Sequence, residues 1–183
     1  MKGIMSNNKK LLFLMVVILF FSIPTLGAKA YVLNGSKFQN PKQLRYYISD
    51  AVVNAGYWAD AKHATTAWGY AAEIEFTGEI VQKVYAEIRF DRSTIDTGDF
   101  ASASNDCYCT YSDYSNITLW KDFDSLKTDA LQKETTVHEV GHSLGLAHEN
   151  DNIGTSIMLD GDHGFIGAIY PQSDDWKGIA ARY

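Results

Sequence analysis

The sequence predicts a single α+β domain, and three observations lead to that class. Runs of alternating apolar and polar residues predict β-strands at 44–48, 72–77, 84–90 and 116–120. Longer segments with the apolar spacing of amphipathic helices follow residue 49 and residue 135. The 183 residues, of which 46% are hydrophobic and 13% aromatic, are enough to build one core.

The first 30 residues differ from the rest and predict a secretory signal peptide. Lys9 and Lys10 precede the apolar run 11–21, and Ala28-Lys29-Ala30 supplies the small residues of a cleavage site. A run of about a dozen apolar residues is shorter than the roughly 20 that a membrane-spanning helix needs. We therefore expect cleavage after Ala30 and a secreted, extracellular protein of residues 31–183, without stable membrane association.

The charge balance argues against nucleic acid as a partner. The predicted signal peptide holds four of the 16 basic residues and none of the 22 acidic ones, so residues 31–183 have a formal charge near -10. Phosphate backbones bind to surfaces of the opposite sign. Residues 31–183 contain no internal repeat and no low-complexity linker, so we expect one domain. We also expect a monomer.

The elements of this domain follow in chain order. Residues 44–48 (LRYYI) are aromatic and β-branched, which is typical of a strand. Ser49 or Asp50 is suited to cap a helix that continues to Trp68. The strands at 72–77 and 84–90 are separated by a stretch that contains Gly78, and both have the alternation of one half-buried sheet.

The second half begins with a long loop. Residues 91–114 are rich in Asp, Ser and Gly without a clear period, which predicts a loop that a short strand interrupts. Residues 116–120 return to strand character, and Thr135 or Thr136 opens the next helix. Ser173 is expected to cap a final helix that runs to Ala181.

Cys107 and Cys109 are the two cysteines of the chain, and they are separated by one residue. That spacing strains an intrachain disulfide. No second pair exists to complete a thiolate metal site. We therefore interpret both as structural or adventitious thiols, and their redox state stays open.

Residues 138–149, HEVGHSLGLAHE, contain three of the five histidines. His138 and His142 are four residues apart, so a helix places them on one face. Gly145 is suited to the left-handed conformation that ends a helix, and the reversed chain would bring His148 to the other two. Three imidazoles that leave a fourth position open to water are typical of catalytic zinc.

Glu139 directly follows the first histidine, and it predicts catalysis. A carboxylate there is suited to take a proton from a zinc-activated water and to pass it to a departing amine. The alternative interpretation is two ordinary helical histidines beside a solvated glutamate. It would require that the glycine and the third histidine occur at these positions by chance. The rival from another class, a non-catalytic secreted zinc-binding module, has no use for this carboxylate and would more often close the fourth position.

The segment HEVGHSLGLAHE resembles the zinc motif of the metzincin metalloproteases. Met158 in TSIML stands ten residues beyond His148, an interval similar to that of the matrixin branch, and QSDDWKGIAARY resembles the matrixin closing helix. The order of helices and strands is also similar, so the resemblance covers residues 31–183. It implies a twisted, mixed and mostly parallel sheet, an active-site helix that binds zinc, and a C-terminal helix.

The resemblance also implies a function and roles for single residues. The protein would be a zinc endopeptidase whose protein or peptide substrate lies extended against a strand edge. Met158 would form a hydrophobic floor beneath the zinc, while Asp174 and Asp175 would tie the last helix to the methionine turn. Residues 159–171 would wall the main specificity pocket, with three candidate side chains: Phe165, Ile169 and Tyr170.

Some positions depart from the matrixin pattern. Glu149 follows the third histidine, where matrixins usually have Ser or Thr and astacins have Glu. Astacins, however, have a longer interval to the methionine and a tyrosine two residues beyond it, where this chain has Asp160. We therefore expect a matrixin-like enzyme and keep an astacin-like one as the alternative. Cleavage after Ala30 leaves almost no room for a propeptide, and no cysteine-switch segment is seen.

Calcium and the remaining histidines complete the sequence predictions. Five aspartates occupy the long loop where matrixins hold calcium: Asp91, Asp96, Asp99, Asp106 and Asp113. Carboxylate oxygens suit calcium, but the spacing matches no fixed calcium pattern, so a calcium site and a merely solvated loop are both open. His63 and His163 lie far apart in the sequence and are expected to be surface or hydrogen-bonded residues.

Overall fold

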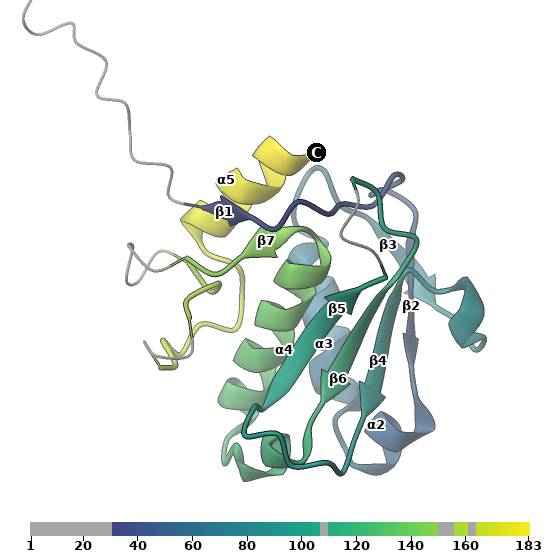
Figure 1. Ribbon diagram of the computed structural model, residues 1–183, viewed down its shortest axis with the longest axis vertical. Coiled ribbons are helices and arrows are strands. Elements are labelled where there is room, and N and C mark those ends of the chain that lie inside the picture. Colours follow the sequence, from purple (N-terminus) through teal and green to yellow (C-terminus); the bar gives the residue numbers. More distant parts are fainter. Residues whose placement is uncertain (1–30, 107–109, 150–155, 161–163) are drawn as a thin grey trace, which may run out of the picture.

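The computed structural model describes residues 31–106, 110–149, 156–160 and 164–183 (Figure 1). The predicted signal peptide and the pair Cys107 and Cys109 lie outside the described residues. Within the described ranges, no helix has the length and apolar character needed to cross a bilayer. Helices combine with a mixed sheet, which confirms the predicted α+β class.

Five strands form the main sheet in the order β3-β2-β4-β6-β5. The neighbours from β3 to β6 run parallel, while β5 runs antiparallel to β6 and forms one edge of the sheet. The mixed, mostly parallel sheet is therefore confirmed. The strands are β2 (Leu44–Ile48), β3 (Phe76–Glu79), β4 (Ile88–Arg92), β5 (Ala101–Asn105) and β6 (Ser115–Leu119).

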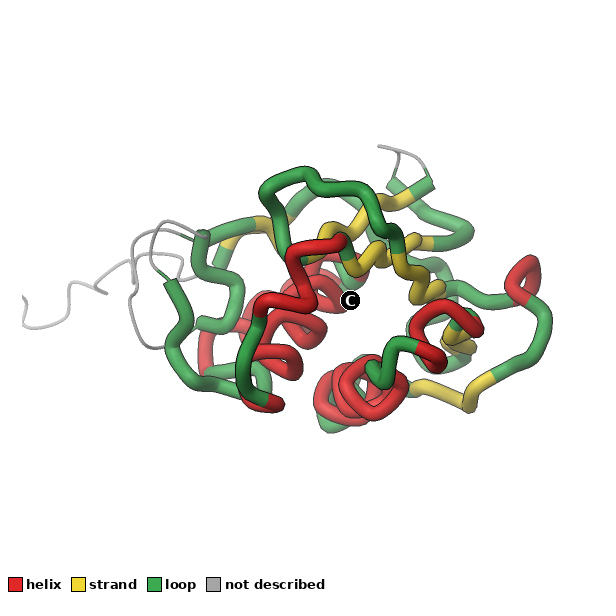
Figure 2. The backbone as a smooth tube through the Cα atoms, turned by 90° about the horizontal axis from the view of Figure 1, so that it is seen from below, coloured by secondary structure: helices red, strands yellow, loops and turns green. Residues whose placement is uncertain are grey.

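Two long helices, α3 and α4, lie side by side against one face of this sheet (Figures 1 and 2). A short antiparallel pair, β1 and β7, packs beside the C-terminal helix α5. The helices and the short pair are α2 (Asp50–Asn54), α3 (Trp58–Trp68), α4 (Asp129–Ser143), α5 (Ser173–Arg182), β1 (Val32–Leu33) and β7 (Leu146–Ala147). Two 3-10 turns, η1 (Lys83–Tyr85) and η2 (Lys121–Ser125), lie in the connections.

The core forms between the sheet and α3 and α4. Alternate residues of β4 and β6 are fully buried, as strand geometry predicts for a sheet covered on one face. Trp68 at the end of α3 is also buried, and its indole N–H donates to the carbonyl of Val137 on α4 over 2.8 Å. This bond fixes α3 beside the part of α4 that carries the histidines.

The predicted helix over 49–68 is wrong as a single element. The chain forms α2 and then α3, and between them Gly56 has a φ of +90°, which no continuing helix accommodates. The predicted cap at Ser49 is confirmed, because its hydroxyl accepts a hydrogen bond from the Val52 N–H. One glycine in an alanine-rich periodic segment therefore decided the break.

The strands predicted at 72–77 and 84–90 are displaced toward the C-terminus. The ladder with β2 begins only at Phe76, since the preceding residues form a turn that buries Ile74. Gly78 lies inside β3 rather than between strands. Residues 83–85 form η1, and β4 begins at Ile88. Alternation alone could not separate a turn that buries one apolar residue from a strand.

Strand 44–48 is confirmed, and strand 116–120 is confirmed with a shift of one residue. The short strand expected within 91–114 is β5. The expected start of the long helix at Thr135 or Thr136 is wrong, because α4 begins at Asp129 and the Thr128 hydroxyl caps it. The cap of α5 is likewise Gln172 rather than Ser173. In both cases the helix extends into polar residues that carry no apolar period.

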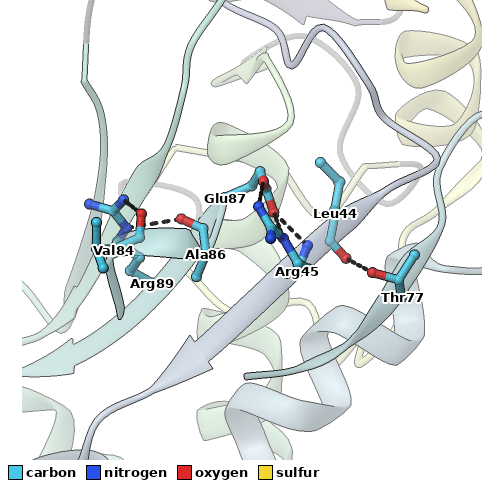
Figure 3. Close-up of polar contacts among 7 residues, drawn as sticks. All are labelled: Leu44, Arg45, Thr77, Val84, Ala86, Glu87 and Arg89. Atoms are coloured by element: carbon cyan, nitrogen blue, oxygen red, sulfur yellow. Dashed lines mark hydrogen bonds and ion pairs between the residues drawn. The ribbon is translucent and has the colours of Figure 1, made fainter. Parts of the chain in front are cut away.

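A polar hollow of about 590 Å³ lies where β2 begins and the loops lead into β4 and β6. One of its walls is an ion pair in which Arg45 Nη2 lies 2.7 Å from Glu87 Oε1 (Figure 3). The backbone N–H of Arg45 also donates to Glu87 over 2.7 Å. Arg89 nearby donates to two backbone carbonyls. None of the three clustered histidines lines this hollow.

Candidate metal centre

Local backbone geometry positions the three histidines. His138 and His142 stand one turn apart near the end of α4, as their spacing predicts. Gly145 has a φ of +102°, which confirms the predicted left-handed turn. A Cβ at Gly145 would collide with the carbonyl oxygen of Ser36, so no other residue fits there without a shift. The reversed chain then enters β7 and reaches His148.

Asn34, near the start of the described chain, stabilises the turn at Gly145. Its side-chain amide donates to the carbonyls of His142 over 2.8 Å and Leu146 over 3.2 Å. Residues 32–33 pair with β7 as an antiparallel strand. The carbonyls freed at the end of α4 are therefore satisfied, and the path to His148 is fixed.

The imidazoles converge on one point. His148 Nε2 lies 3.1 Å from His138 Nε2 and 3.0 Å from His142 Nε2. Among the described residues, these three are the group of histidine, cysteine or acidic side chains that could hold a metal ion. His148 is exposed, whereas His138 and His142 are half-buried.

The hydrogen bonds of the rings select the tautomer that a metal needs. His138 Nδ1 lies 2.8 Å from the Ile157 carbonyl, and His142 Nδ1 lies 2.9 Å from the Leu146 carbonyl. A carbonyl only accepts, so each Nδ1 carries the hydrogen and each Nε2 turns a lone pair to the centre. These tautomers are assigned from their partners.

The spacing of the nitrogens fits a small cation. A single hydrogen on His148 Nε2 cannot fully serve both neighbouring lone pairs, whereas one cation between them serves all three. Two nitrogens bound to tetrahedral zinc at roughly 2.0–2.1 Å lie about 3.3 Å apart, close to the separations found here. Burial lowers the pKa of His138 to about 3 and that of His142 to about 4. Both rings are therefore neutral at ordinary pH, as ligands must be.

The side chain of Glu139 extends from α4 to the edge strand β5. Its side chain is buried, and burial raises its pKa to about 8, although a hydrogen bond from the Ala103 backbone N–H opposes that rise. Oε2 has no hydrogen-bond partner among the described residues. A cation in the histidine cluster would lower this pKa by favouring the charged carboxylate. The site thus contains one buried carboxylate oxygen with nothing to bind.

Met158 packs against α4 at Gly141. It is buried, and a Cβ on Gly141 would collide with its sulfur, so the methionine packs directly against the turn of helix between His138 and His142. The Met158 carbonyl accepts a hydrogen bond from the Glu149 N–H over 2.8 Å. Met158 therefore packs directly against the helix that carries His138 and His142.

Asp175 links α5 to this floor. Its carboxylate accepts from the Ser156 hydroxyl over 2.6 Å and from the Ile157 N–H over 2.8 Å. The carbonyl of the same Ile157 accepts from His138, so the backbone of this one residue connects Asp175 to the first histidine. Asp174, which the sequence grouped with Asp175, accepts from Lys177 over 2.7 Å.

The three candidate wall residues contact Phe100, which precedes β5, and His63 on α3. The Phe165 ring lies 5.7 Å from that of Phe100, just before β5, and the Ile169 carbonyl lies 2.7 Å from His63 Nε2 on α3. Tyr170 packs its ring edge against His63. His63 is thus hydrogen-bonded, as expected, whereas His163 lies outside the described residues.

Sequence reasoning missed Glu134, one turn before His138. It is buried on α4, and its carboxylate binds the backbone of the wall segment. An acidic residue at a helix position that faces the core was the available signal, since such residues are rarely buried without a partner.

The five loop aspartates do not assemble a metal group with other acidic side chains within the described ranges. Asp91 accepts from Ser49 and Lys83, and Asp96 accepts from Lys121. Asp106 accepts from the backbone N–H of Asp113. Three of the five aspartates therefore have protein partners.

No protein-family model matches the chain, and no curated protein matches it. Among solved structures, the chain is similar to one described as "GM1 bound form of the ECX AB5 holotoxin", with a TM-score of 0.53 and 15% identity. The match covers 84% of this chain and 86% of that chain. At this identity the likeness concerns the fold alone. The protein is therefore an α+β domain in which His138, His142 and His148 could hold a metal ion.

Proposed function

We propose that this protein is a secreted zinc endopeptidase of the metzincin type, matrixin-like in the spacing of its motifs. The observation that carries the proposal is the meeting of three imidazole nitrogens beside a buried carboxylate with an unused oxygen. The left-handed conformation of Gly145 and the burial of Met158 against α4 support the proposal. Secretion rests on the signal-like sequence of residues 1–30.

Zinc is the metal that suits this donor set. His138, His142 and His148 offer three nitrogens and no thiolate, and zinc binds imidazole readily with the fourth position left to water or substrate. The hydrogen bonds to the carbonyls of Ile157 and Leu146 orient two of the rings, as the partners of metal-bound histidines do.

Bound zinc would act as a Lewis acid that polarises a peptide carbonyl and acidifies water to a pKa of about 7. Glu139 would accept the proton of the attacking water and donate it to the departing amine nitrogen. Its burial supports this role, because a carboxylate with a raised pKa both accepts and returns a proton near neutral pH.

The edge of β5 supports a peptide as the substrate. β5 has a sheet neighbour on one side only, and Ala103 in its centre donates its N–H to Glu139. An extended peptide would pair through its backbone along this edge and present its carbonyl groups beside Glu139. A small ester would leave most of the edge unused.

Substitution of Glu139 by Gln tests the proposal. We expect the purified variant to keep one zinc per chain and to lose about 10²–10⁴-fold in the digestion of denatured casein. Zinc content is measured by metal analysis and digestion by release of soluble peptides, with and without a chelator. Turnover close to that of the unmodified protein would refute the assigned base. A zinc-loaded protein that digests nothing would favour the non-catalytic module.

A further inference from the structure

Residues 164–170, here called the wall segment, are exposed over much of their length yet held at three points. The Phe165 ring packs against Phe100, and the Ile169 carbonyl oxygen lies 2.7 Å from His63 Nε2. The middle contact comes from Glu134 on α4. The segment therefore bridges from the residue before β5 to both long helices.

The middle contact is the most specific of the three. Glu134 Oε1 accepts from the Ile166 N–H over 2.7 Å, and Oε2 accepts from the Gly167 N–H over 2.9 Å. The side chain is 6% exposed, and burial raises its pKa although both hydrogen bonds oppose that rise. Burying a carboxylate is unfavourable unless its oxygens are hydrogen-bonded. Here the chain uses both oxygens on two consecutive amides.

The backbone of the wall segment requires such an anchor. Gly164 and Gly167 have φ values of +68° and +76°, so glycines that adopt a left-handed conformation bracket Phe165 and Ile166. Glycine adds conformational freedom that the fold must remove. Two adjacent N–H groups aimed at one point form a concave anion site, which a carboxylate fills with both oxygens and an amide with only one.

We propose that Glu134 is a positioning residue that holds the wall segment one helical turn from His138 and thereby selects the substrate side chain beside the scissile bond. The inference rests on the proposed endopeptidase function. Because Glu134 and His138 are four residues apart on the same helix, the distance between the wall and the metal centre is set by one rigid element. Loss of the two hydrogen bonds would free the wall while leaving the metal ligands in place.

The test compares Glu134→Gln with Thr135→Val in the full chain. Gln keeps the shape but accepts at one oxygen and turns an amide N–H group toward the second donor. Thr135 is the matched control, since it is also buried on α4 but its hydroxyl, among the described residues, bonds the Leu131 carbonyl and not the wall segment. We expect Glu134→Gln to retain zinc and to raise KM about tenfold for the best peptide, with kcat changed less than about threefold.

Cleavage of a peptide library supplies the specificity readout. In Glu134→Gln the preference at the residue after the scissile bond should broaden, while Thr135→Val should keep the original profile. An unchanged profile and KM in a folded, zinc-loaded Glu134→Gln protein would overturn the inference and leave the proposed function standing. Absence of cleavage by the unmodified protein would instead overturn the proposed function.

Hydrogen exchange tests the anchor without any activity. In the unmodified protein the amides of Ile166 and Gly167 should exchange at least about tenfold more slowly than that of Val81, which lies in a loop and is 91% exposed. Glu134→Gln should abolish this protection and leave the amides of α4 unchanged. If the variant does not fold, the measurement on the unmodified protein still decides, because amides that exchange as fast as that of Val81 would exclude the anchor.

Discussion

The histidine centre and the polar hollow beside β2 differ in how their polar groups are satisfied. In the hollow, Arg45 and Glu87 neutralise each other and share hydrogen bonds. In the centre, three imidazole nitrogens face one another, and Oε2 of Glu139 has no partner among the described residues. Matched charges stabilise a fold without offering reactivity, whereas buried groups without partners cost stability and are retained where they bind or react.

Removal of one of the three proposed metal ligands should have the largest effect on zinc binding and hydrolysis. In His148→Ala, two nitrogens remain, and we expect zinc content to fall below detection together with peptide hydrolysis. At a free zinc concentration about 1,000 times the Kd, binding adds about 4 kcal/mol to the free energy of unfolding. The variant should therefore also lose the stabilisation by added zinc. Thermal unfolding with and without zinc measures this, and a zinc-dependent midpoint in the variant would contradict the three-histidine site.

Asp175→Asn should weaken the same centre from a distance. The asparagine amide cannot accept from both Ser156 and Ile157, so the backbone at Ile157, whose carbonyl holds His138, loosens. Loss of such supporting contacts typically lowers metal affinity about 10–100-fold. Competition with a zinc indicator measures the change. Lys177→Met, which removes one partner of Asp174 instead, serves as the control and should leave zinc affinity unchanged.

Asp60 tests the cost of an unmatched buried charge away from the histidine cluster. Its Oδ1 has no partner within the described part of the chain, and burial raises its pKa from 3.8 to about 6, with the charge of Asp129 adding to the rise. The folded state therefore binds the proton more tightly, so stability falls as pH rises from about 3.8 to about 6.

Asp60→Asn should remove this cost. We expect a gain in the free energy of unfolding that grows with pH and levels off above pH 6 at about 3 kcal/mol. Urea unfolding at pH 4 and pH 7 measures the difference. A gain of equal size at both pH values would show that packing, rather than ionisation, is responsible.

The smallest effect is expected in the hollow. Glu87→Gln removes one charge of a pair that is partly exposed, and partly exposed ion pairs contribute little. We expect a slight drop in the thermal midpoint and unchanged zinc content and hydrolysis. A loss of hydrolysis in this variant would break the distinction between the two regions and assign the hollow a role in function.

Several elements could not be predicted from local pattern. The break at Gly56 and the turn that buries Ile74 both lie in segments whose apolar spacing continues through them. The early start of α4 at Asp129 depends on the Thr128 cap and on polar residues without an apolar period. Pattern reports which side chains are buried, but tertiary packing decides where pairing begins and ends.

The sequence by itself determined that the three histidines come together. His138 and His142 share a helix face because of their spacing, and Gly145 reverses the chain because it adopts a positive φ. Both effects act within a few residues. Only the tertiary structure decided that Glu134 binds the wall segment and that Asp175 supports His138, because hydrogen bonds between residues distant in the chain form only after the elements have packed.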